Sequence, residues 1–231
     1  MNQIEIQIQV NYLGPNIEAS DIQAILDTGQ STSTLICQRS VLEGFLDLPL
    51  SCIGPEVLQR YVEATSGLHK MAFPASEQIH TRLLMPLRSA KKNYCFGDYL
   101  ATVAASGVAA EMIAVLIWII NIEKLKDHQL TENDREDYPE FGCTSERRGQ
   151  AERVEVLKKA GLISSEDKSE FSAIRELRKR YLHWWSIDLH KEKDDALKAY
   201  SKAFNLFRKF VPLTIGDGGV LVFDPRLLEF L

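Results

Sequence analysis

The feature that most constrains the fold is a nearly continuous apolar stretch from Ala101 to Asn121, ATVAASGVAAEMIAVLIWIIN, with Glu111 at its centre. Its length approaches the roughly 20 residues that a bilayer core requires, so a membrane-spanning helix is one interpretation. A carboxylate is costly at that depth, and no Lys/Arg-rich segment flanks the stretch. We therefore expect the central buried helix of a soluble bundle, where helices that are apolar on all sides also occur.

The composition is that of a folded globular chain. Hydrophobic residues make up 45% of the 231 residues and charged residues 26%, which is far from the signature of disorder. The four cysteines are widely spaced and form no C-x-x-C pair, so free thiols in a reducing cytoplasm are expected rather than a zinc or redox motif. The chain opens without a basic, apolar leader, which also favours a cytoplasmic location.

Charge is unevenly distributed along the chain. The net charge is -5, but the segment from Glu146 to Lys209 carries 16 Lys or Arg against 11 Asp or Glu, while the rest carries 11 against 21. A basic C-terminal part is compatible with a polyanionic partner on one face, and a solvated helical surface of mixed sign would show a similar balance.

Long helical periods begin after Pro74 and predict a bundle of about five helices over residues 76–210. Pro86 is expected to kink the first of these helices, and residues 130–148 read as a charged, exposed loop. The expected helices are 76–94, 98–126, 145–160, 165–190 and 194–210.

Both ends of the chain lie outside this bundle. Residues 1–75 are expected to form an N-terminal appendage with a strand at Ile4–Val10 and short helices at 21–26 and 56–64. Residues 211–231 contain a second expected strand, Val220–Phe223, which could pair with the first and pack on the main domain. The predicted fold class is therefore mainly α with a small terminal β element.

The helix predicted after Ser165 carries an arginine among apolar residues. Its apolar side chains occupy an arc of roughly 160° on a helical wheel, wider than a coiled-coil seam, and Arg178 falls inside this arc. A partly desolvated guanidinium requires an acceptor. Glu111, alone in its own apolar helix, is the expected partner.

His183 lies about 140° around the wheel from Arg178, on one stripe with Glu176 and Lys179. The two residues could therefore meet only across a groove, through the reach of arginine, or after a local break in the helix. A structural arginine beside an ordinary exposed histidine is the alternative.

The run IRELRKRYLH, from Ile174 to His183, resembles the Arg-x4-His signature of HEPN domains. The wider layout is also similar, with an Ala-rich helix containing Glu111, a charged loop, and then the segment KKAGLISSEDKSEFSAIRELR from Lys158 to Arg178. The resemblance covers residues 76–210 and implies a HEPN-like helical bundle.

Many HEPN proteins are metal-independent ribonucleases that work as homodimers with facing motifs. The resemblance implies that Arg178 holds the scissile phosphate and that His183 acts as general acid or base. A guanidinium fork matches phosphate oxygens and an imidazole titrates near neutrality, so attack by the RNA's own 2′-hydroxyl needs no metal. Arg175, Lys179 and Arg180 would add positive charge to the approach, with Glu111 and Glu176 in supporting positions.

A second functional class stays open. Lys179 and Trp185 stand where active HEPN members often have other residues, and the family also contains non-catalytic modules that bind nucleotides or proteins. The histidines show no metal-binding spacing, so neither a metal nor a cofactor is expected. The expected partners are a second copy of the chain, RNA or a nucleotide, and an antitoxin-like protein, without a membrane.

Overall fold

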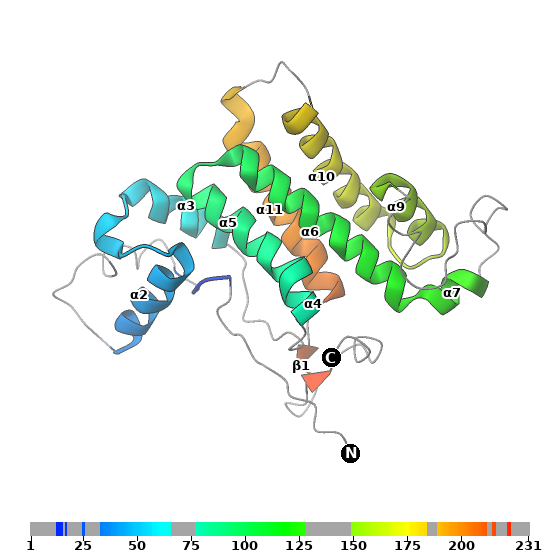
Figure 1. Ribbon diagram of the computed structural model, residues 1–231, viewed down its shortest axis with the longest axis horizontal. Helices are drawn as coiled ribbons and strands as arrows, with labels where there is room; N and C mark the ends of the chain where they lie inside the picture. The colour runs from blue at the N-terminus through cyan, green and yellow to red at the C-terminus, as the bar shows by residue number, and fades with distance from the viewer. Residues whose placement is uncertain are drawn as a thin grey trace.

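The computed structural model is mainly helical, which confirms the mainly α part of the predicted class. It describes residues 13–15, 17, 25, 33–65, 77–127, 149–183, 189–211, 214–215 and 221–222. Helix α6 (Tyr99–Ile120) is the centre of the molecule and packs against α5, α9, α10 and α11. Figure 1 shows α6 running between α5 and α10, with α11 behind it.

Helix α6 forms where the apolar stretch predicted it. The Asp98 side chain caps its first turn by accepting a hydrogen bond from the amide of Ala101 at 3.0 Å. The helix is long and apolar enough to cross a bilayer by length and composition, and 56% of its most apolar window is buried within the protein. It ends at Asn121, whose side-chain amide donates to the carbonyl of Ile117 at 2.8 Å. This side-chain bond interrupts the predicted helix 98–126, which continues as α7 (Ile122–Asp127).

The helix before α6 changes its geometry at the expected proline. It begins as α4 (Glu77–Ile79), widens into a π-helix at His80–Leu84, and continues as α5 (Met85–Phe96). Pro86 has no N–H to donate to the carbonyl four residues earlier, so the regular hydrogen-bond ladder cannot continue through it. The segment therefore runs on with a local π turn, and α5 ends at Gly97 with φ +82°.

The C-terminal half supplies the other helices around α6. These are α9 (Gln150–Lys159), α10 (Ser165–His183), the short 3-10 helix η4 (Leu189–Lys191) and α11 (Glu192–Phe210). A reciprocal cap fixes the start of α10. The Ser164 hydroxyl accepts from the Asp167 amide at 3.1 Å, and the Asp167 carboxylate accepts from the Ser164 amide at 2.7 Å.

Lys209 of α11 also donates to Asp167 at 2.7 Å, which ties the first turn of α10 to the end of α11. Of the predicted helix 165–190, α10 covers 165–183, while the prediction was wrong for residues 189–190, which belong to the 3-10 helix η4. Residues 184–188 and the predicted loop 130–148 lie outside the described residues. The predicted helix 194–210 is confirmed by α11.

The N-terminal part contains α2 (Ser33–Leu46), the 3-10 helix η2 (Leu50–Cys52) and α3 (Pro55–Thr65). The expected helix 56–64 is confirmed by α3. The expectation of short elements only was wrong for α2, which is 14 residues long and buries Leu42, Phe45 and Leu46 in a second apolar cluster. This cluster joins the bundle where α3 packs against α5.

Two short strands, β1 (Thr214–Ile215) and β2 (Leu221–Val222), pair antiparallel with Thr214 opposite Val222. Strand β2 lies within the expected strand Val220–Phe223. Its proposed partner Ile4–Val10 lies outside the described residues, as does the predicted helix 21–26 apart from Ile25. A terminal sheet built from both ends of the chain therefore stays a prediction.

Candidate functional site

Arg178 lies in the last third of α10 and crosses the surface of α6. Its Nη1 donates to Glu111 Oε2 at 3.1 Å, which confirms the predicted pair. The approach depends on Gly107, one turn before Glu111 on α6. A Cβ added at Gly107 would stand 2.5 Å from the Arg178 Cδ, so the absence of a side chain gives the arginine its path. The Arg178 and Glu111 side chains remain 35% and 32% exposed, so solvent reaches the pair.

A second arginine belongs to the same site and was missed by sequence reasoning. Arg153 of α9 is only 2% exposed, and α9 packs against both α6 and α10. Burial lowers the pKa of its guanidinium, and the nearby Glu111 carboxylate opposes that shift by stabilising the positive charge. Glu111 therefore lies within the electrostatic reach of two arginines that come from different helices.

The sequence of α9 gives only a weak signal for the burial of Arg153. Its buried positions include Gln150, Arg153, Val154 and Leu157, a helical spacing that places two polar residues on the packed face. Because α9 is short and largely polar, the sequence does not show which of its faces is buried. The buried face becomes clear only once α9 is placed against α6 and α10.

His183 is the last residue of α10, and the helix runs without interruption from Arg178 to His183. A local break between the two residues is therefore absent. Five residues of regular helix separate their Cα atoms by about 140° of rotation and about 7.5 Å along the axis. The backbone of His183 is described, but its side chain lies outside the described part of the structure. The geometry of the site therefore includes the helical position of His183 and none of its side-chain contacts.

The three predicted approach residues differ in their surroundings. Arg175 forms a surface pair with the neighbouring Glu176 at 3.3 Å, and Lys179 is exposed. Arg175 lies one helical turn before both Arg178 and Lys179 on α10, whereas Arg178 and Lys179 are adjacent in sequence and about 100° apart around the helix. Arg180 instead faces α11, where its Nη1 pairs with Asp195 at 3.1 Å.

The contacts of Arg180 form a structural link between helices. The Asp195 carboxylate that it meets also accepts a hydrogen bond from the Tyr181 hydroxyl at 2.9 Å. Burial and this carboxylate raise the pKa of Tyr181. The exposed positive charge beside Arg178 therefore comes from Arg175 and Lys179 more than from Arg180.

Exposed apolar side chains border the Arg178–Glu111 pair. Val108 follows Gly107 on the outer side of α6, Leu182 lies one turn after Arg178 on α10, and Leu100 lies two turns before Val108. All three are large hydrophobic residues with substantial exposure. We call these three exposed residues, two from α6 and one from α10, the α6 stripe.

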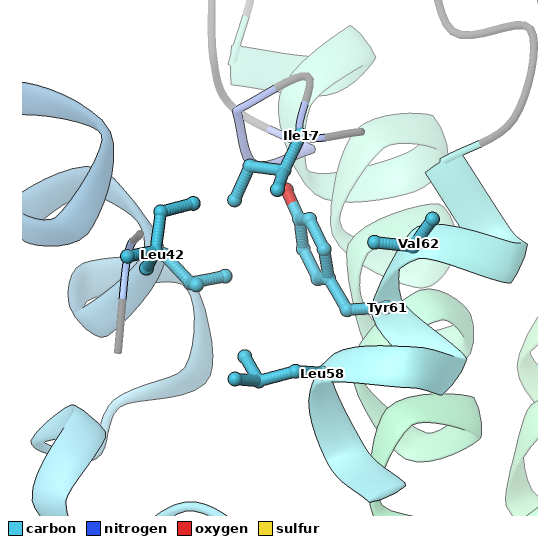
Figure 2. Close-up of a pocket in the computed structure, with 6 residues that line it drawn as sticks. Ile17, Leu42, Leu58, Tyr61 and Val62 are labelled. Carbon is cyan, nitrogen blue, oxygen red and sulfur yellow. The ribbon is translucent and has the colours of Figure 1, made fainter. Parts of the chain in front are cut away.

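A separate shallow pocket lies in the N-terminal part, with about 180 Å³ of empty space that includes open solvent. Figure 2 shows its lining of aliphatic side chains around the ring of Tyr61. The Tyr61 hydroxyl donates to the carbonyl of Pro15 at 2.5 Å, so the polar atom of this ring is already used. The pocket lies in the second apolar cluster, away from the charged site.

Within the described ranges, no three His, Cys, Asp or Glu side chains gather closely enough to hold a metal ion. The charged site consists of two guanidinium groups and one carboxylate, a combination suited to binding an anion.

Neither a family model, nor a curated protein, nor a solved structure matches the chain. The HEPN resemblance therefore rests on the residues of this sequence alone.

Proposed function

We propose that the chain is a HEPN-like, cytoplasmic homodimer that binds RNA and cleaves it without a metal. The observation that carries the proposal is Arg178, a guanidinium laid across Gly107 and aligned by Glu111 while about a third of it stays exposed. Positioning of this kind reduces the entropy that a long side chain loses when it grips a phosphate. The unbroken end of α10 carries His183 on the same rigid element.

The proposed reaction uses the nucleophile that RNA carries. One His183 imidazole takes the proton of the 2′-hydroxyl, the 2′-oxygen attacks the adjacent phosphorus, and the bond to the 5′-oxygen breaks. A protonated imidazole, supplied by the second subunit, gives its proton to that leaving oxygen. Arg178 stabilises the negative charge that develops on the phosphoryl oxygens. The products are a 2′,3′-cyclic phosphate and a 5′-hydroxyl end.

The homodimer in this proposal uses the α6 stripe. Leu100, Val108 and Leu182 are exposed apolar residues, and the last two lie one helical turn from Glu111 and Arg178 on their own helices. Covering them with a second copy would remove apolar surface from water and bring two α10 helices to one interface. This arrangement supplies the second histidine that the reaction needs.

The test is cleavage of a single-stranded RNA in the presence of EDTA by wild type, Arg178→Ala and His183→Ala, with Arg208→Ala as control. Arg208 is an exposed arginine of α11, so its replacement removes the same charge away from the site. We expect Arg178→Ala and His183→Ala each to lower the rate about 100-fold or more, and Arg208→Ala to leave it within about twofold.

Equal cleavage by all four proteins would show that the activity does not belong to this site and would refute the proposal. RNA or nucleotide binding that depends on Arg178, without any cleavage, would replace it with the non-catalytic binding module of the same predicted fold. Product ends other than 2′,3′-cyclic phosphates would refute the role of the 2′-hydroxyl.

A further inference from the structure

The charged site contains an internal anion where a phosphate would be expected to bind. Arg178 contributes a partly exposed guanidinium, and the group that it holds in the structure is the Glu111 carboxylate. A carboxylate and a phosphate diester offer similar oxygen acceptors to a guanidinium fork. RNA bound at Arg178 must therefore compete with Glu111.

If Arg178 were the only cation near Glu111, a phosphate that took Arg178 would leave the Glu111 carboxylate without a positive partner. Arg153 changes that balance, because it acts on Glu111 from α9 and is too buried to leave the site. The three groups together carry two positive charges and one negative charge. Arg153 can therefore balance the charge of Glu111 while a ligand occupies Arg178.

The buried face of α9 that carries Arg153 also contains an unused donor. Gln150 is 8% exposed and lies three residues before Arg153, so the two share one face of α9. Among the described residues, the Gln150 Nε2 has no hydrogen-bond acceptor. A buried amide without an acceptor is uncommon, and this donor lies on the same buried face of α9 as Arg153.

We propose that Glu111 acts as a stand-in for the RNA phosphate on Arg178, and that Arg153 is a positioning residue that retains Glu111 when the phosphate displaces it. The proposal rests on the RNA binding proposed above and assigns Glu111 and Arg153 distinct parts in it. Glu111 keeps Arg178 aligned in the free protein, and Arg153 makes the exchange of partners possible.

The experiment measures RNA affinity by fluorescence anisotropy for wild type, Glu111→Gln and the control Glu152→Gln, at salt concentrations between about 50 and 200 mM. Glu152 is an exposed carboxylate of α9, so its variant makes the same change in net charge away from the pair. A competing, partly exposed ion pair predicts that Glu111→Gln tightens RNA binding about threefold to tenfold. Glu152→Gln should change it less than about twofold.

The part played by Arg153 is measured in two backgrounds. Arg153→Gln should weaken RNA binding in the wild-type background, because Glu111 then depends on Arg178 alone. In the Glu111→Gln background the same change should have less than about a twofold effect, since no carboxylate remains to be retained. A purely structural role would lower affinity equally in both backgrounds. If Arg153→Gln does not fold, the comparison of Glu111→Gln with Glu152→Gln still decides the proposal.

A ligand-free measurement separates this inference from the proposed function. Phenylglyoxal modifies accessible arginines, and mass spectrometry reports the rate at Arg178 in wild type, Glu111→Gln and Glu152→Gln. We expect Arg178 to react several times faster in Glu111→Gln only. Absence of RNA binding in every protein would refute the proposed function, whereas equal Arg178 reactivity in the three proteins, or weaker RNA binding by Glu111→Gln, would refute the stand-in.

Discussion

Replacement of the buried Lys91 by Met should change how stability depends on pH. The Lys91 ammonium donates to the carbonyl of Leu13 at 2.7 Å and lies 4.0 Å from the ring centre of Tyr61 and 5.2 Å from that of Phe45. The rings favour the charged amine by about 0.5 to 2 kcal/mol. Desolvation opposes the charge by on the order of 5 kcal/mol, so the neutral amine is favoured at a much lower pH than usual.

The direction of the pH effect follows from the difference between the pKa of Lys91 in the folded chain and its pKa in the unfolded chain. Burial lowers the pKa of Lys91 from 10.5 to about 7. Above about pH 7 the folded chain holds a neutral amine, while the unfolded chain stays protonated until about pH 10.5, so unfolding takes up a proton. The free energy of unfolding must then rise with pH. The slope approaches about 1.4 kcal/mol per pH unit, which gives about 1.5 kcal/mol between pH 7 and pH 8.5.

The Lys91→Met variant removes the titrating group and retains its length. It also leaves the Leu13 carbonyl without its donor, at a cost of about 1 to 3 kcal/mol, and loses the ring contacts. We therefore expect it to be about 0 to 3 kcal/mol more stable than wild type near pH 6, with an advantage that shrinks as the pH rises.

Urea denaturation of both proteins at several pH values between about 6 and 8.5 measures this difference. Subtracting the two curves removes the contribution of other groups, among them Cys95, whose pKa burial raises to about 12. Lys92→Met is the matched control, because Lys92 pairs with Asp47 at the surface and should show the wild-type slope. Parallel stability curves for wild type and Lys91→Met would refute the reasoning and show that the rings and the carbonyl keep the amine charged.

Three further outcomes follow from the packing. Gly107→Ala should shift the Arg178 side chain and lower RNA affinity by about threefold or more, which anisotropy measures; unchanged affinity would contradict the role of the glycine. Val108→Glu on the α6 stripe should convert the homodimer to monomers in sedimentation velocity, whereas a persistent dimer would place the interface elsewhere. A thiol reagent should label exposed Cys52 well before buried Cys95 in the folded protein, and simultaneous labelling would contradict the burial of Cys95.

The sequence predicted best those elements whose signals are local. The apolar stretch defines α6, and Asp98 is a recognisable capping residue for its start. The break at Asn121 was missed because asparagine is also tolerated within helices, and only its bond to the Ile117 carbonyl shows which conformation it takes. Helix α2 was missed because Gly29 and Pro49 on either side of it favour turns, although the interval between them is long enough for a helix.

The same distinction applies to the site. An arginine within an apolar arc and a lone carboxylate within an apolar helix each lack a local partner, so their pairing followed from physical necessity. The burial of Arg153 depends on how α9 packs against two other helices, which no short window of sequence encodes. Arg180 looked equivalent to Arg175 on the sequence, yet its contact with Asp195 of α11 appears only in three dimensions.

The Arg178–Glu111 pair is poorly explained by stability alone, and a double substitution tests this. Partly exposed ion pairs typically contribute about 0 to 1 kcal/mol, and apolar replacements of similar volume are often neutral or stabilising. We expect Arg178→Met combined with Glu111→Leu to unfold within about 1 kcal/mol of wild type, while RNA affinity falls about tenfold or more. A loss of several kcal/mol of stability with RNA affinity retained would make the pair structural. A stable protein that no longer binds RNA would show that Arg178 and Glu111 serve RNA binding and are not needed for the packing of α6 against α10.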